Sequence, residues 1–451
     1  MQAHGALDAR HRSQICPPND FKQPRGARPA ERFHTALRSY RVLRDLTPEQ
    51  IQNFMDSYLI YSLDWADEEK MVATLGKDYE NVVGQKLADY YCVLNHLCAL
   101  GELEKMYIPP AMDLDQNLTM NQILYERQIC EELQLPPHAR VLELGCGRGR
   151  VAAHISSLTS ARITGLNIDA DQIASAQSFN TQQFFQNTFV RADFNSLPLP
   201  LESASFDAFY QIQAFSLAKD HDALCRELFR LLKPGARLSL LDWVSLEAYN
   251  PNNAHHTQLM TRIKPLIGAV GTPTPASLAA SLEQAGFVML DSKNVSINGL
   301  QAPLIERADG FFRNLKRCVL GGVKVGLLPG HFRTLFERLT RDCDAFVQAD
   351  REGLCTTSWR WLAVKPETAV VGETQVEEEG VGLGLVAPVA EGKGSGNGSG
   401  NGDSAYASLS SSQEAVDRQQ QRGGEKKGGG GDGGGVVESG DGVDRGKEVA
   451  K

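Results

Sequence analysis

The chain has 451 residues, and its 55 Asp and Glu exceed its 46 Lys and Arg, giving a formal net charge of −9 at pH 7. Fifteen acidic and eight basic residues lie after residue 365, so only about −2 of this charge belongs to the preceding part. This near neutrality argues against DNA or RNA as a partner, because phosphate binding depends on clustered Lys and Arg. A neutral small molecule or a lipid suits the composition better.

Cysteine usage and hydropathy bear on the compartment. The nine Cys form no CxxC pair and no apolar signal segment opens the chain, so neither a disulfide framework nor a metal site is expected. The longest apolar stretches, 238–244 and 319–328, are shorter than the roughly 20 residues that cross a bilayer. We expect a cytoplasmic protein, either soluble or in peripheral contact with a membrane such as the endoplasmic reticulum; a plastid location stays open.

Both ends of the chain are expected to be disordered. Residues 1–35 are rich in Pro, Arg and His with little periodicity, and Asp8 and Asp20 disfavour a transit peptide. Residues 366–451 are rich in Gly, Ser and Glu with almost no aromatic residue, so they cannot bury enough apolar surface to offset their ordering entropy.

Residues 36–135 are predicted to form a helical cap that contributes to substrate binding. Thr47 is a predicted helix N-cap with Pro48 at the first helical position, and Ile51, Phe54 and Tyr58 share the apolar face. Further helices are expected as far as Cys130.

From 136 to 365, short apolar runs alternate with helical segments. Five strands are predicted first, at 140–144, 161–166, 189–192, 206–212 and 238–244. A helix after Thr274-Pro275 and final strands at 288–290 and 359–364 follow them. Residues 222–232 form a crossover helix ended by Lys233-Pro234-Gly235. This alternation predicts an α/β fold with a doubly wound, Rossmann-like, seven-stranded and mainly parallel sheet.

A glycine-dense loop follows the first strand, at the sheet edge where ligands bind. Its spacing, Gly145-Cys146-Gly147-Arg-Gly149, differs from the G-x-G-x-x-G of dinucleotide sites, and Glu143 precedes it. A pyrophosphate would gain nothing from that carboxylate, whereas a ligand with a sulfonium and an ammonium would. The loop therefore predicts an aminoacyl-sulfonium cofactor, with a structural turn or a nucleotide loop as the alternatives.

Later strand ends supply further candidate cofactor residues. Asn167 stands where an acid normally holds a ribose, and Asp169 either binds a hydroxyl or caps the next helix. Gln172 is assigned to the same site. Asp193 is expected at the exocyclic amine of adenine with Phe194 on its ring; a polar strand terminus is the alternative.

These segments together resemble class I S-adenosylmethionine-dependent methyltransferases and, among them, the sterol 24-C-methyltransferase family. The similarity covers about 80–365 and includes 141–149, 164–167, 192–194, 205–210, 232–235, 242–244, 249–253 and 286–287. The stretch from Trp243 to Asn253 carries the resemblance to this family in particular. It implies S-adenosylmethionine as cofactor and carbon methylation of a sterol, triterpene or related isoprenoid lipid.

The chain departs from the family pattern where substrate is expected. Residues 102–110 replace an aromatic, glycine-rich segment, and Gln213 stands where the family has a glutamate, although an amide cannot accept a proton as a carboxylate can. Glu126 matches a family glutamate, and proton loss is expected to go to Glu126, Asp242 or water. Aromatic faces that could stabilise a carbocation are Tyr90, Tyr91, Tyr107, Tyr125, Tyr210 and Trp243.

Two other functions stay open from the sequence. One is O- or N-methylation of another hydrophobic molecule, with His221, His255 or His256 as a base. The other is a cofactor-binding protein without catalysis.

Overall fold

The structure is a computed structural model that describes residues 29–101 and 103–367, and every structural statement below concerns those residues. The helices are α2 (Pro29–Arg44), α3 (Pro48–Ser57), α4 (Glu68–Leu75), α5 (Tyr79–Leu100), α6 (Leu118–Leu133), α7 (Arg150–Thr159), α8 (Ala170–Gln182), α9 (His221–Leu231), α10 (Ala254–Ile267), α11 (Pro275–Gln284), α12 (Ala302–Lys324), α13 (His331–Leu339) and α14 (Cys343–Arg351), with short 3-10 turns η1 (Tyr58–Ser62), η2 (Phe215–Leu217) and η3 (Ile297–Gly299). The strands are β1 (Arg140–Leu144), β2 (Arg162–Asn167), β3 (Thr188–Arg191), β4 (Phe206–Ile212), β5 (Leu232–Ser245), β6 (Val288–Asn294) and β7 (Cys355–Val364).

The strands form one seven-stranded sheet in the order β3-β2-β1-β4-β5-β7-β6. Strands β1 to β5 pair in parallel, and β7 runs antiparallel to both of its neighbours. The predicted doubly wound, mainly parallel α/β sheet is therefore confirmed. Strand order reverses between β1 and β4, which is where such sheets open a ligand crevice at the carboxyl ends of their strands.

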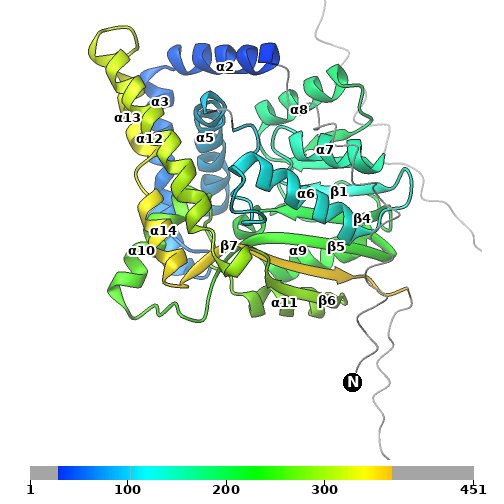
Figure 1. The fold of residues 1–451 in the computed structure, drawn as a ribbon. Helices are drawn as coiled ribbons and strands as arrows, with labels where there is room; N and C mark the ends of the chain where they lie inside the picture. Colours follow the sequence, from blue (N-terminus) through cyan, green and yellow to red (C-terminus); the bar gives the residue numbers. More distant parts are fainter. Residues whose placement is uncertain (1–28, 102, 368–451) are drawn as a thin grey trace, which may run out of the picture. The chain divides into compact units, whose positions relative to one another are not determined.

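Helices cover both faces of the sheet (Figure 1). On one face, Leu224 and Leu228 of α9 and residues of α11 pack against the sheet around Phe209. On the other face, α6, α7 and α8 pack against alternate residues such as Val141 and Ile163. Neighbouring strand positions thus point into two separate cores, as the two-residue repeat of a strand requires.

A third core joins the N-terminal helices to helices inserted between β6 and β7. Phe54 of α3 and Leu97 of α5 pack with Phe332 and Phe336 of α13. The cap predicted from 36–135 therefore also contains residues far along the chain. The N-terminal helices and the helices between β6 and β7 cover each other's apolar faces, so neither set could bury its apolar face alone.

Local signals for helix starts agree with the structure. Thr47 accepts from the Gln50 backbone N–H at 3.2 Å, and the Gln50 side chain accepts from the Thr47 N–H at 2.9 Å, completing a capping box. The boundary of the predicted leader differs: α2 begins at Pro29, because its apolar residues, including Leu43, pack into the cap. The predicted tail lies outside the described residues from position 368 onward.

Candidate active site

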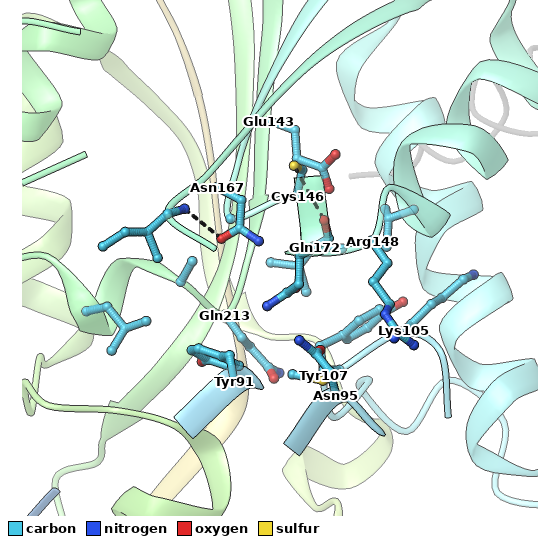
Figure 2. Close-up of a pocket in the computed structure, with 18 of the residues that line it drawn as sticks. Tyr91, Asn95, Lys105, Tyr107, Glu143, Cys146, Arg148, Asn167, Gln172 and Gln213 are labelled. Atoms are coloured by element: carbon cyan, nitrogen blue, oxygen red, sulfur yellow. Dashed lines mark hydrogen bonds between the residues drawn. The ribbon is translucent and has the colours of Figure 1, made fainter. Parts of the chain in front are cut away.

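A pocket opens at the carboxyl ends of β1, β2 and β4, and it encloses about 980 Å³ of space free of protein atoms, counting its open mouth. The predicted cofactor residues that line it are Glu143, Gly145, Cys146, Gly147, Asn167, Gln172, Asp193 and Phe194. Figure 2 shows Tyr91 and Asn95 across the pocket from Glu143 and Asn167.

The first two loop glycines hold the backbone against the pocket. Gly145 has φ +71°, and a Cβ there would lie 2.6 Å from the Ala214 Cβ. Gly147 has φ +52°, and its Cβ would lie 3.2 Å from Gln172 Oε1. Positive φ favours glycine at both positions, and at Gly145 the lack of space excludes any side chain as well. Gly149 does not line the pocket; a Cβ there would lie 2.7 Å from the Phe189 ring, so its role is close packing between α7 and the sheet.

Glu143 is a buried carboxylate that faces this pocket. It is 4% exposed, and its Oε2 has no hydrogen-bond partner among the described residues. The strand register places it beside Tyr210 of β4. Burial, opposed in part by the neighbouring Tyr210 hydroxyl, raises the pKa of Glu143 to about 8. A buried, unpartnered carboxyl is costly unless a ligand supplies a cation or donors, so the site suits a cationic ligand group.

The structure separates the two candidate ribose residues. Asn167 lines the pocket, whereas Asp169 does not. Asp169 Oδ1 accepts from the backbone N–H groups of Asp171 at 2.8 Å and Gln172 at 3.1 Å, so it caps α8. The capping alternative is therefore what the structure shows for Asp169, while the Gln172 side chain reaches the pocket.

Helix α5 supplies a wall of the pocket, of which Tyr91 was predicted at the site and Leu87 and Asn95 were not. Leu87, Tyr91 and Asn95 recur at four-residue spacing and line the pocket together. Asn95 is 5% exposed, and its Oδ1 lacks a hydrogen-bond partner among the described residues. Helical spacing of the three residues was the available signal, but it did not indicate which element this face contacts.

Three basic residues also line the pocket. Arg150 pairs with Glu104 at 2.8 Å, and Lys105 pairs with Glu126 at 2.5 Å. The Arg148 side chain makes no hydrogen bond or ion pair with another described residue, and burial together with Arg150 lowers its pKa. Arg148 therefore presents a positive charge that an anionic ligand group could neutralise.

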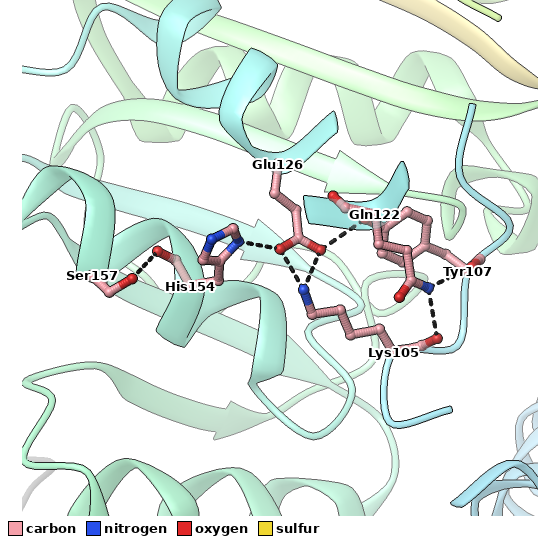
Figure 3. A network of polar contacts seen from close by, with 6 residues as sticks. All are labelled: Lys105, Tyr107, Gln122, Glu126, His154 and Ser157. Carbon is pink, nitrogen blue, oxygen red and sulfur yellow. Dashed lines mark hydrogen bonds and ion pairs between the residues drawn. The ribbon is translucent and has the colours of Figure 1, made fainter. Parts of the chain in front are cut away.

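Glu126 lies behind the pocket at the centre of a polar network (Figure 3). Its fully buried carboxylate accepts from Lys105 Nζ, from the Tyr107 hydroxyl at 2.8 Å, and pairs with His154 Nδ1 at 2.5 Å. Burial opposes ionisation, but Lys105 and His154 outweigh it and lower the pKa of Glu126. Glu126 does not itself line the pocket but lies one side chain behind it, where it holds Lys105 and Tyr107, which do line it. Its expected role as a base stays a prediction.

The other predicted catalytic residues lie in different surroundings. Gln213 lines the pocket, but its Nε2 donates to the Ile108 carbonyl at 2.6 Å and the Thr357 carbonyl at 2.9 Å, and its Oε1 accepts from the Ile108 N–H at 3.0 Å. Asp242 is fully buried beyond the pocket and accepts from the backbone N–H of Phe215 at 2.7 Å. Both residues therefore connect segments of the fold.

Of the six aromatic candidates, Tyr91 and Tyr107 line the pocket. The remainder are packed in the interior: Tyr90, Tyr125, Tyr210 and Trp243. No histidine lines the pocket within the described residues, and these residues also contain no cluster of three His, Cys, Asp or Glu side chains suited to a metal ion.

Comparison with known proteins identifies the domain. A family model described as a methyltransferase domain matches residues 142–240. Cycloartenol-C-24-methyltransferase from Arabidopsis thaliana is 31% identical over 262 residues, which cover 54% of this chain and 76% of that protein. Sterol 24-C-methyltransferase from Pneumocystis carinii is 25% identical over 324 residues, covering 66% and 81% of the two chains. Botryococcene C-methyltransferase from Botryococcus braunii is 28% identical over 256 residues, covering 55% and 67%.

Among solved structures, the cyclase SpnF shares the fold, with a TM-score of 0.51 and 19% identity over 63% of this chain and 97% of that one. The sequence relatives identify the family as well as the fold, because the Arabidopsis protein is more than 30% identical to this chain over three quarters of its own length. The glycine loop, the buried Glu143 and the sheet order agree with that similarity. The chain therefore belongs, as a divergent member, to the sterol 24-C-methyltransferase family of enzymes that use S-adenosylmethionine as cofactor.

Proposed function

We propose that this methyltransferase transfers its methyl group to a carbon atom of an isoprenoid lipid, a sterol or a triterpene. The observation that supports this substrate class is the apolar and aromatic part of the pocket lining, which includes Leu87, Tyr91, Met106, Tyr107 and Leu217. The three relatives above are named as C-methyltransferases of cycloartenol, sterols and botryococcene. An apolar wall binds such molecules by removing hydrocarbon surface from water.

The pocket residues suit the two charged ends of the cofactor's amino-acid moiety. In this proposal Glu143 holds the ammonium and Arg148 the carboxylate, because each lacks an ion-pair partner among the described residues. Asn167 and Gln172 contact the ribose hydroxyls, and Asp193 with Phe194 contact adenine. When bound, S-adenosylmethionine supplies an electrophilic methyl group on a sulfonium.

The remaining pocket residues orient the lipid and exclude water. Helix α5 covers the side opposite the sheet, and alignment without water supplies much of the rate of a displacement reaction. The rings of Tyr91 and Tyr107 stabilise the positive charge that develops on the lipid after methylation of an alkene. A water molecule held in the pocket then accepts the proton whose loss gives the neutral product. No histidine among the described residues lines this pocket, so O-methylation here would need a base other than His221, His255 or His256.

Product analysis tests this function. The full chain is incubated with methyl-labelled S-adenosylmethionine and either cycloartenol or botryococcene, and mass spectrometry locates the label. A methyl group on carbon supports the proposal; a methyl group found on oxygen or nitrogen overturns it, as does bound cofactor with no turnover on either lipid.

Two glycine variants control for loop geometry. Gly145→Ala should abolish turnover, because a Cβ would lie 2.6 Å from Ala214 at a φ of +71°. Gly310→Ala in α12 should retain it, because a Cβ there meets nothing within 4 Å.

A further inference from the structure

The connection between α12 and α13 projects two large apolar side chains into solvent. Val325 is 69% exposed and Leu327 is 77% exposed. Leu328, at the base of the turn, packs against the cap core, whereas a Cβ built on Gly326, between Val325 and Leu327, would meet nothing within 4 Å. Exposed apolar residues at a projecting turn indicate a surface that is covered in use.

Basic residues surround this turn on α12, α13 and the neighbouring α2. His331 Nε2, at the start of α13, lies 2.7 Å from the Leu43 carbonyl of α2, and the Tyr40 ring packs against Phe332 with centroids 6.0 Å apart. Figure 1 shows α2 and the turn on the same side of the fold. The exposed basic residues of segments 33–45 and 317–337 are Arg38, Arg41, Arg44, Arg317, Lys324 and Arg333.

The acidic residues of these two segments are Asp45 and Glu337, and Asp45 already pairs with Arg44 at 2.7 Å; the first turn of α2 adds one acid and one base, Glu31 and Arg32. The surface is therefore positive in a chain whose formal net charge is −9. A local excess of Lys and Arg beside protruding apolar side chains is complementary to an anionic lipid surface, where headgroups pair with the charges and acyl chains cover the apolar groups.

The shape favours a bilayer over a protein partner. A stable protein interface takes about 800 Å² from each partner, with a packed apolar centre. Val325 and Leu327 instead form a narrow tip, which a fluid lipid layer can enclose without a matching groove. No helix in 29–101 or 103–367 is long and apolar enough to cross a membrane.

We propose that the surface formed by α2 and the α12–α13 turn docks on an anionic lipid bilayer, with Val325 and Leu327 inserted between the headgroups. Helix α5 connects this surface to the pocket, since it packs against α2 and α13 and lines the pocket with Leu87, Tyr91 and Asn95. Docking there places the pocket wall one helix away from the bilayer. The docking does not depend on which isoprenoid is methylated.

Vesicle co-sedimentation of the full chain tests this surface. The protein should sediment with vesicles that contain phosphatidylserine and stay in solution with phosphatidylcholine alone, and high salt should weaken the binding. The double variant Val325→Asp, Leu327→Asp should lose about tenfold in vesicle affinity, and Lys324→Glu with Arg333→Glu should do the same. These side chains are exposed, so the melting temperature should stay within a few degrees.

A matched control is Phe184→Asp, which removes a side chain that is 91% exposed between α8 and β3 and should leave vesicle binding unchanged. Failure of the full chain to bind either vesicle would overturn the proposal. Vesicle binding by the Val325 and Leu327 double variant equal to that of the parent would also overturn it. So would binding to immobilised polyglutamate that is as strong as vesicle binding and is unchanged in the double variant, since that result indicates an acidic protein partner. Methylation of detergent-dispersed lipid by the same variants reports on the proposed function separately.

Discussion

Lys105 Nζ lies 2.5 Å from a carboxylate oxygen of the fully buried Glu126. Lys105 lines the pocket and Glu126 does not, so the ion pair lets a buried residue fix the position of a pocket side chain. The same carboxylate also binds Tyr107 and His154. Glu126 is thus a positioning residue for two pocket side chains.

Glu126→Gln should destabilise the fold by about 3–5 kcal/mol, because it removes the charge that compensates Lys105 in a buried setting. Since the folded state lowers the pKa of Glu126 from its ordinary 4.5, the stability it contributes is complete above pH 4.5 and is lost as the pH falls through the lower folded-state pKa. Urea denaturation at several pH values measures this. A variant as stable as the parent at pH 7 would show that the ion pair has no net effect.

Glu143→Gln should weaken S-adenosylmethionine binding by at least about tenfold, because hydrogen bonds to charged groups contribute roughly 1.5–3 kcal/mol. The unliganded carboxyl has a pKa of about 8, so binding a cationic group at pH 7 should release a proton. Calorimetry in buffers of different ionisation enthalpy detects that release. Unchanged affinity in the variant, or no proton release by the parent, would contradict the assignment.

The same carboxyl should make the free protein less stable as the pH rises. Its folded pKa lies above the ordinary 4.5, so stability falls between pH 4.5 and about 8 and then levels off. Glu143→Gln should remove this slope. Thermal melts across that pH range provide the comparison with the unmodified chain.

Arg148→Met should reduce affinity for S-adenosylmethionine about thirtyfold while leaving affinity for its decarboxylated analogue nearly unchanged, because only the former offers a carboxylate to the guanidinium. Arg226→Met, at an exposed position on α9, is the control. Titration calorimetry with both ligands separates the cases. Equal losses for the two ligands would place Arg148 elsewhere than at the carboxylate.

Gln213→Glu tests whether the missing family glutamate is a working base. The structure predicts a loss of about 1–3 kcal/mol of stability and no gain in activity, since the amide donates to two carbonyls that a carboxylate would repel. Stability and turnover on cycloartenol are measured together, with Gln182→Glu on the exposed face of α8 as the control. Higher turnover on cycloartenol would instead show that Gln213 replaced a base.

Local sequence was sufficient for the sheet and for most of the pocket residues at the ends of its strands. Short apolar runs predicted β1 and β4, and Lys233-Pro234-Gly235 marked the end of α9. The glycine spacing with Glu143 predicted a pocket at the end of β1, which the structure contains. These features depend on side-chain period, turn chemistry and backbone freedom, all of which act over a few neighbouring residues.

The tertiary structure alone decided which faces meet. Gln213 is joined to Thr357 across 144 positions of sequence, and α12 and α13, which lie between β6 and β7 in the chain, pack into the cap. Glu126 and Asp242 have the chemistry of bases, yet burial places both behind the pocket, while α5 brings Tyr91 into it. Sequence patterns specify that a helix has an apolar face, but the partner of that face depends on packing between distant segments, because the hydrophobic effect is non-directional.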